Sequence, residues 1–460
     1  MQITIFISTV ILLTLMGYYM GRSRAVRSVN GNVSKLHSLP RHYGYYVAIW
    51  CGFPAFVVCF LWLSFETQII NSMILGGLSN VTPDLSSAAI ARILSDLKFL
   101  AINSTGKAAS NPEMVLAAAR YNELQQVGTA GLFISILAVA IMGLLFGRKA
   151  VSQNLKARNW VEKMIGYLLL ASSIVAVLTT IGIVASLLFE AIRFFGKVPI
   201  TDFLFGLEWS PQIALRKDQV ASQGSFGAVP IFAGTMLISF IAMCVAVPIG
   251  LMSAIYMSEY ATPRIRSLGK PVLEILAGIP TVVYGFFAAI VVAPTIRSIG
   301  DSWGIQVASE SALAAGLVMG VMIIPFVSSL SDDVIRAVPQ ALRDGSYALG
   351  ATKSETVIQV VFPAALPGIV GAVMLAISRA IGETMIVVMA AGLSANLTAN
   401  PLHAVTTATV QMVTLLVGDQ EFDSPKTLAA FALGLVLFGI TLCLNVVALR
   451  VVAKYREKYD

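Results

Sequence analysis

Apolar segments long enough to cross a lipid bilayer recur along the whole chain. A membrane-spanning helix needs about 20 consecutive apolar residues. The segments that approach or exceed this length are residues 2–20, 44–65, 127–147, 165–192, 229–257, 271–296, 311–330, 366–392 and 426–449. The pattern predicts an all-α, polytopic membrane protein with about nine transmembrane helices in the lipid bilayer. In the first segment the basic residues follow the apolar run, so we expect a retained helix rather than a cleaved signal peptide.

Lys and Arg concentrate in alternate connecting segments. Most of the 31 basic residues lie in residues 21–43, 148–164, 258–270, 331–365 and 450–460. Cytoplasmic loops of membrane proteins carry such an excess. We therefore expect the N-terminus outside and the C-terminus in the cytoplasm. The same bias accounts for the net charge of +7 without a nucleic-acid partner.

One basic segment, residues 148–164, separates the first three predicted spans from the last six. We expect a three-helix membrane extension over residues 1–147, this cytoplasmic linker, and a transmembrane core over residues 165–460. The extension contains a long predicted extracytoplasmic segment at residues 66–126. The best helical pattern within that segment is Ser87–Ala101.

The composition excludes several classes of protein. The chain is 57% hydrophobic and 12% charged, whereas soluble domains carry about 25% charged residues. The four cysteines form no CxxC pair and the three histidines have no metal-ligand spacing, so we expect neither a disulfide framework nor a metal site. The sequence has no nucleophile–base set and no GxxxxGK[ST] loop. We therefore expect a non-catalytic chain without catalytic residues or a bound cofactor.

Two charged residues, Arg379 and Glu383, lie inside the eighth predicted span, in "AISRAIGETMIVV". Four residues apart, they would share one helix face and pair. Such a pair either locks two helices or subunits together or belongs to a substrate pathway, in which Arg379 attracts an oxyanion and Glu383 limits how tightly it is held. Thr384 adds a neighbouring hydroxyl, although a Thr within a helix usually bonds its own backbone.

Proline and glycine recur in the last six spans. The segment "GIPTVVYG" predicts a kinked helix that packs simply or lines a pathway, and its marked positions are Gly278, Pro280, Tyr284 and Gly285. Glu274 reads as a helix-end charge. Asp332 and Asp333 read as caps on the protein surface.

A polar, helix-forming stretch lies in the predicted cytoplasmic loop at residues 331–365. We expect a helix over residues 340–349, a break at Gly350, and a second helix from Thr352 to Val361 that ends at Pro363. "TKSE" has the spacing of a capping box. Two short helices fixed between two spans suit the transmission of force from a soluble partner. An amphipathic loop lying on the membrane surface is the alternative.

This stretch resembles the EAA loop of ABC importer permeases. That loop reads EAA, three residues, Gly, nine residues, then Ile-x-Leu-Pro, and here the matching positions are Asp344, Gly345, Ser346, Gly350, Val360, Phe362 and Pro363. The spacing agrees throughout. The letters depart at the triplet, with Asp for Glu and Gly-Ser for Ala-Ala, and at Val360 and Phe362. The resemblance implies that the loop docks into an ATPase subunit.

Two further stretches, "GIPTVVYGFFA" and "SRAIGETMIVVMAAG", are similar to phosphate-specific permeases of the PstC type. The sister PstA type reads GETAP where this chain has GETM. The resemblance covers roughly residues 160–460. It implies a type I ABC importer permease core of six helices, preceded here by three extra helices, with Arg379 and Glu383 in phosphate passage.

The resemblance also implies partners and a location. It places the chain in the cytoplasmic (inner) membrane with a PstA-type sister permease, a PstB-type ATPase dimer that binds ATP and Mg, and a periplasmic PstS-type phosphate-binding protein. It allows a phosphate-signalling regulator as a further partner, or a role as a sensor. The alternatives are a permease for sulfate, molybdate or phosphonate, and an ion-coupled secondary transporter, against which the docking loop argues.

Overall fold

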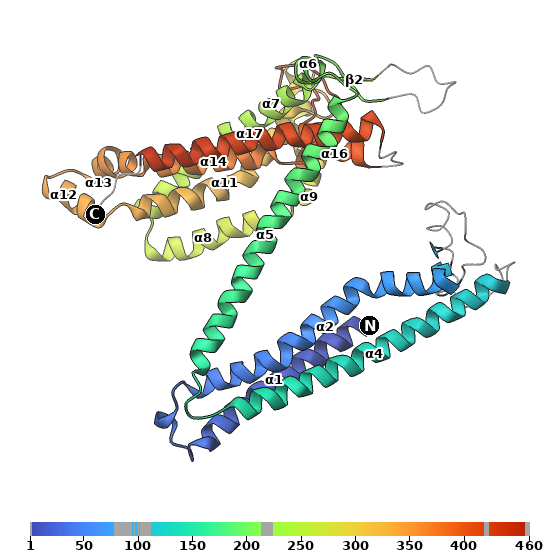
Figure 1. Cartoon of the computed structure of the whole chain (residues 1–460). Coiled ribbons are helices and arrows are strands. Elements are labelled where there is room, and N and C mark those ends of the chain that lie inside the picture. The colour runs from blue at the N-terminus through green and yellow to red at the C-terminus, as the bar shows by residue number, and fades with distance from the viewer. Residues whose placement is uncertain are drawn as a thin grey trace. The chain divides into compact units, whose positions relative to one another are not determined.

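The computed structural model of the chain is almost entirely helical (Figure 1). It describes residues 2–77, 94–95, 97–99, 101, 112–212, 224–417 and 423–455. Within these residues, nine helices are long and apolar enough to cross a membrane. They are Thr4–Ser28, Pro40–Ile74, Leu116–Ala150, Ala157–Phe195, Val229–Tyr260, Thr281–Ser302, Ala312–Ala337, Lys353–Ile381 and Pro425–Lys454. The predicted all-α membrane fold and its nine spans are confirmed, with shifted boundaries.

The chain divides into two compact units, Met1–Val177 and Leu178–Asp460. The division falls inside one long helix, α5 (Ala157–Phe195). The predicted linker at residues 148–164 overlaps the end of α4 (Pro112–Ala150) and the start of α5.

The first unit packs three long helices along one another: α1 (Gln2–Ser28), α2 (Pro40–Gly77) and α4, with a short turn η1 (Val33–Lys35) after α1. Glycine permits their close approach, because a Cβ at Gly143 would lie 2.0 Å from the carbonyl oxygen of Trp50. Much of the predicted segment 66–126 is helical, because α2 and α4 extend into it. The helix predicted at Ser87–Ala101 lies mostly outside the described residues.

The second unit begins with the rest of α5 and a small cap that follows it. The cap holds α6 (Ile200–Phe205) and a two-stranded antiparallel pair, β1 (Trp209–Ser210) and β2 (Ser225–Phe226), with Trp209 opposite Phe226. The elements that follow are α7 (Val229–Ile255), the π-turn η2 (Tyr256–Tyr260), α8 (Pro263–Gly278), α9 (Thr281–Phe287), the π-turn η3 (Ala288–Val292), α10 (Ala293–Ser302), α11 (Ala312–Ala337), α12 (Gln340–Ala348), α13 (Lys353–Thr356), the π-turn η4 (Val357–Val361), α14 (Phe362–Ile381), α15 (Met385–Ala390), α16 (Ala408–Leu416) and α17 (Pro425–Tyr455).

The centre of this unit is the contact between α7 and α11. Small residues on α11 let the two backbones approach, since a Cβ at Gly320 would lie 2.8 Å from Cβ of Val245. Met319 and Ile323 are fully buried beside it. Figure 1 shows α11, α14 and α17 running alongside one another in this unit. Such tight packing gives α11 a fixed frame from which its polar end can position charges.

The sixth predicted span, residues 271–296, is wrong as a single helix. Helix α8 ends at Gly278, and the chain is extended at Ile279 and Pro280 before α9 begins. Proline has no N–H to donate, and it disfavours the helical conformation in the residue before it. Pro280 therefore separates a polar helix, α8, from the spanning helix Thr281–Ser302.

The boundaries of the seventh and eighth spans also differ from those predicted. Helix α11 extends to Ala337, into the segment predicted as loop. The helix that starts at Lys353 does not end at Pro363 but continues to Ile381. In the π-turn η4, the Phe362 N–H donates to the carbonyl of Val357, five residues back. This wider turn carries the helix past a proline that would interrupt the usual bonding pattern.

Candidate functional site

A cavity of about 280 Å³ lies between helices α8, α11 and α14. Helix α8 lines it with Arg266, Lys270, Leu273, Glu274 and Ala277. The spacing of these residues places them on one face of the helix. Helix α11 contributes a facing stripe from Met322 to Asp332, and α14 contributes Arg379. The cavity thus has mostly apolar walls, three cationic side chains and two carboxylates.

Arg379 lies in the last turn of α14, and its side chain is exposed to the cavity. Its guanidinium carbon lies 5.6 Å from the centroid of the Phe326 ring on α11. A cation over an aromatic face is held by the ring quadrupole. Among the described residues, Arg379 forms no ion pair within 4 Å. Arg379 is thus a cation inside a span, and it has no carboxylate partner among the described residues. It is therefore available to an anionic ligand.

The predicted pairing of Arg379 with Glu383 on one helix face is wrong. Helix α14 ends at Ile381, and α15 begins at Met385. The Glu383 carboxylate instead accepts hydrogen bonds from the backbone N–H groups of Met385 (2.9 Å) and Ile386 (3.3 Å). It caps the start of α15, where a negative charge is favourable.

Thr384 occupies the position just before α15 and makes no side-chain cap. The Glu383 carbonyl accepts a hydrogen bond of 2.8 Å from the Thr409 hydroxyl, which holds the break in place. Of the three residues predicted for the substrate pathway, only Arg379 lines the charged cavity.

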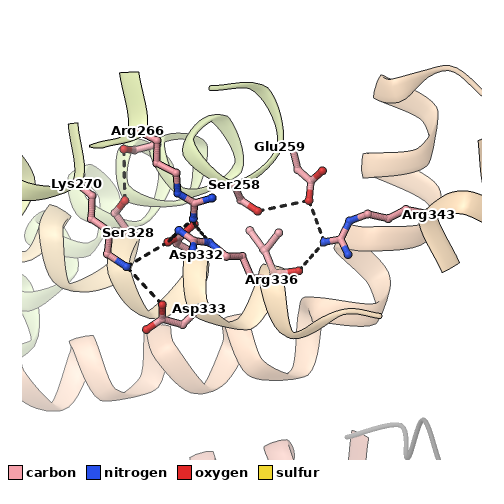
Figure 2. A network of polar contacts seen from close by, with 11 residues as sticks. Ser258, Glu259, Arg266, Lys270, Ser328, Asp332, Asp333, Arg336 and Arg343 are labelled. Atoms are coloured by element: carbon pink, nitrogen blue, oxygen red, sulfur yellow. Dashed lines mark hydrogen bonds and ion pairs between the residues drawn. The ribbon is translucent and has the colours of Figure 1, made fainter. Parts of the chain in front are cut away.

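At the other end of the cavity, α8 and α11 form a charge cluster around Asp332 (Figure 2). The Asp332 side chain is only 5% exposed. It accepts contacts from Arg266 at 3.1 Å, from Lys270 at 3.5 Å and from Arg336 at 2.6 Å. The prediction that Asp332 is a surface cap is therefore wrong. Its neighbour Asp333 is 63% exposed, as expected, and contacts Lys270 at 3.6 Å.

Sequence reasoning missed this cluster. The spacing of Asp332 and Arg336 was visible as an i, i+4 pair. The contributions of Arg266 and Lys270 come from more than 60 residues away along the chain. Only the break at Pro280, which frees α8 from the following span, brings the two bases to the end of α11.

The segment from Gly278 to Gly285 has the break that its proline predicts, but none of its four marked residues lines the charged cavity. The Tyr284 hydroxyl donates to the carbonyl of Leu276 across the break at 2.8 Å. A Cβ at Gly285 would lie 2.7 Å from Sδ of Met389. These contacts show a tightly packed corner between α8, α9 and α15.

The loop predicted to dock a partner folds around Gly350 as the short helix α12, followed by α13, which opens the long helix Lys353–Ile381. Gly350 has φ of +87°, a left-handed conformation that other residues adopt at a cost. The predicted capping box is present: the Thr352 hydroxyl accepts from the Glu355 N–H, and the Glu355 carboxylate accepts from the Thr352 N–H at 2.7 Å. Ser346 and Thr356 join the two helices through a buried hydroxyl contact of 2.9 Å.

The outer surface of this loop is partly apolar. Leu349 is 92% exposed, and Tyr347 and Ile358 are also exposed. Asp344 and Gly345 are exposed beside them. At the end of the motif, Val360 and Phe362 are half-buried and Pro363 is exposed.

A second buried charge pair fixes α12 to the helix bundle. Arg343 on α12 is 7% exposed and lies 3.0 Å from the Glu259 carboxylate in η2. The same guanidinium donates to the carbonyls of Ile335 (2.8 Å) and Val338 at the end of α11. Figure 2 shows Arg343 reaching Glu259. The loop is thus held to both α7 and α11, the two helices at the centre of the unit.

These features define a multi-pass membrane protein with a charged cavity and a helical loop. Residues 246–457 match the family model described as the binding-protein-dependent transport system inner membrane component. Residues 7–106 match a model described as a phosphate ATP-binding cassette transporter.

Two relatives that are permeases by name agree with this class. A probable ABC transporter permease, YqgH of Bacillus subtilis, is 32% identical over 242 residues, which are 53% of this chain and 74% of the relative. The phosphate transport system permease PstC of Haemophilus influenzae is 30% identical over 231 residues, which are 46% and 69% of the two chains. A solved structure of the MetNI methionine ABC transporter is 18% identical and covers 50% of this chain and 95% of its own, with a TM-score of 0.38. The chain belongs to the family of binding-protein-dependent transport system inner membrane components.

Proposed function

We propose that the chain is a permease subunit of an ATP-driven importer that carries inorganic phosphate across the cytoplasmic membrane. The observation that carries this proposal is the relationship to permeases named for phosphate transport, including PstC of Haemophilus influenzae. A match to a phosphate transporter model at residues 7–106 supports it from a separate part of the chain. The two sequence stretches that resemble PstC-type permeases point to the same substrate, phosphate.

The cavity has the chemistry that an oxyanion requires. Arg379 presents a planar guanidinium, a group that binds oxyanions through paired N–H groups. Its partner among the described residues is the face of Phe326, not a carboxylate. A ligand anion therefore gains a charge-assisted contact without displacing an ion pair. Arg379 is the residue we assign to phosphate passage.

We propose that the loop containing α12 and α13 docks into a separate ATPase subunit. Its exposed apolar residues, Tyr347, Leu349 and Ile358, would become buried there. ATP and Mg bind to that partner, since the chain has no phosphate-binding loop of the GxxxxGK[ST] type. A PstA-type sister permease and a periplasmic PstS-type phosphate-binding protein complete the assembly. Because the loop meets the ATPase in the cytoplasm, the N-terminus lies outside and the C-terminus lies in the cytoplasm.

Transport follows from two states of the assembly. Closure of the ATPase pair favours one state, and phosphate release favours the other. A ligand shifts such an equilibrium only by the difference between its affinities for the two states. Movement of the docked loop reaches the bundle through Arg343, which binds α11 and η2 together. The chain itself performs no covalent chemistry on phosphate.

The first test measures uptake of labelled phosphate at micromolar concentration in cells that lack this gene and any second phosphate importer. Restoring the intact chain is expected to restore uptake, and restoring Arg379→Gln is not. Copurification of the ATPase with Arg379→Gln checks that the complex still assembles. Uptake of sulfate, molybdate or phosphonate in place of phosphate would reject the substrate but keep the permease. Loss of assembly in Arg379→Gln would show a packing role instead.

A further inference from the structure

The charged cavity has two cationic regions rather than one. Arg379 lies over Phe326 in the middle of α11. Asp332 lies six residues beyond Phe326 on the same helix. There it contacts Arg266 and Lys270, which belong to α8. At a rise of 1.5 Å per residue the two regions are about 9 Å apart along α11. Both line the same cavity.

The two bases on α8 have hydrogen-bonding capacity left for a ligand. A guanidinium has five N–H donors. The side chain of Arg266 uses only Nη2, which lies 3.1 and 3.4 Å from the two oxygens of Asp332, in its contacts with the described residues. With the described residues, the Lys270 ammonium makes two long ion-pair contacts, 3.5 Å to Asp332 and 3.6 Å to Asp333, and its side chain is 37% exposed.

Asp332 does not depend on these two bases alone. Arg336 donates to both of its oxygens, from Nε at 3.0 Å and from Nη2 at 2.6 Å. Asp332 therefore keeps a two-point partner when Arg266 and Lys270 turn toward a ligand. The three bases contact two carboxylates, Asp332 and Asp333, and Glu274 on α8 also lines the cavity.

We propose that Arg266 and Lys270 form a second binding station for a tetrahedral oxyanion, placed between Arg379 and the end of α11. The inference rests on the proposed function and deepens it. A water molecule occupies about 30 Å³ in the liquid, so a cavity of about 280 Å³ has room for an oxyanion together with several waters. Ser329, half-buried on α11, also lines the cavity.

Asp332 sets how tightly this station holds its ligand. It competes with the oxyanion for the same two cations, and Glu274 adds a second carboxylate to the lining one turn further along α8. Carboxylates beside a bound anion weaken its binding. The station thus attracts the ion leaving Arg379 and still releases it.

Protection of an engineered thiol tests the station directly. Ser329→Cys is introduced after the exposed Cys244 and Cys443 are replaced by Ala, while Cys51 and Cys59 are buried. The assembled transporter is reconstituted in lipid, and its rate of labelling by a small maleimide is measured in inorganic phosphate, sulfate or chloride. We expect phosphate to slow labelling several-fold relative to chloride, with a saturable dependence on its concentration.

Lys270→Gln is the decisive variant, because Asp332 keeps Arg266 and Arg336 as partners and the cluster stays paired. We expect the concentration of phosphate needed for protection to rise about tenfold, as for loss of one charge-assisted hydrogen bond. Arg264→Gln is the matched control. It removes a positive charge from the same helix at an exposed position outside the cavity lining, and it should leave protection unchanged.

Each result decides a different point. Protection by phosphate that Lys270→Gln weakens and Arg264→Gln does not supports the station. Equal protection in the two variants overturns it. No protection by phosphate or sulfate, together with phosphate uptake that needs Arg379, also overturns the station and leaves the transport function standing. Protection by sulfate and not phosphate supports an oxyanion station and rejects phosphate as the substrate.

Discussion

Replacing Arg343 by Met tests whether the loop is clamped to the helix bundle. The variant keeps an unbranched side chain, but it shortens that chain and removes its charge. In the native protein the guanidinium lies 3.0 Å from Glu259, and both side chains are 9% exposed. It also satisfies the carbonyl of Ile335 at 2.8 Å and that of Val338. The change therefore removes the charged partner of a buried carboxylate and the side-chain donor to two carbonyls.

The cost of this change follows from what remains unpaired. Removing one partner of a buried ion pair costs about 3–5 kcal/mol. The only other side-chain contact of the Glu259 carboxylate among the described residues is the Ser258 hydroxyl, at 3.4 Å. We expect Arg343→Met to destabilise the second unit by about 4 kcal/mol. Adding Glu259→Gln removes the uncompensated charge, so the double variant should be more stable than Arg343→Met alone.

The assay measures thermal unfolding of the purified transporter in lipid nanodiscs, and the ratio of phosphate imported to ATP hydrolysed. Arg343→Met should lower the unfolding midpoint strongly and lower the transport ratio. Arg158→Met is the control, because the pair between Arg158 and Glu162 is 64% and 57% exposed. Exposed pairs of this kind contribute little. Equal shifts for Arg343→Met and Arg158→Met, or no recovery in the double variant, would refute the clamp.

Three further predictions concern local geometry. Gly350→Ala should cost about 1 kcal/mol of stability because φ is +87° there. Gly350→Pro should uncouple ATP hydrolysis from uptake. Unchanged uptake per ATP in the proline variant would argue against a force-transmitting loop. Thr352→Ala should cost about 1 kcal/mol through loss of the helix cap, and the unfolding midpoint compared with that of Thr352→Ser measures it. Gly143→Leu should separate α4 from α2, since a Cβ would already lie 2.0 Å from the Trp50 carbonyl oxygen; normal protease resistance of the first unit would contradict this.

The features that the sequence predicted correctly depend on neighbouring residues. The nine spans follow from apolar runs, and the capping box at Thr352 follows from a four-residue pattern. The break at Gly350 follows from a single residue, and the structure shows that this glycine adopts the left-handed conformation. Each of these signals is complete within about 20 residues of chain, so no knowledge of the packing is needed to read it.

The features that it missed depend on where the helices stop and on what packs beside them. Gly382 ends α14 and turns Glu383 from a partner of Arg379 into a cap of α15, although the spacing of the two residues suits a helical pair. Asp332 looked like a surface residue because its partners Arg266 and Lys270 reach it from another helix. Such contacts depend on how the helices pack against one another, and the local sequence pattern carries no information about that packing.

The two charge clusters share the last two turns of α11, and this relation joins the loop to the cavity. Asp332 holds the bases of α8 on one side of these turns. The carbonyls of Ile335 and Val338, three and six residues further along, hold Arg343 of α12. A displacement of α12 therefore acts on the same short segment that positions Arg266 and Lys270. Because packed interfaces shift between discrete arrangements rather than deform smoothly, the state of the loop and the geometry of the cation cluster should change together.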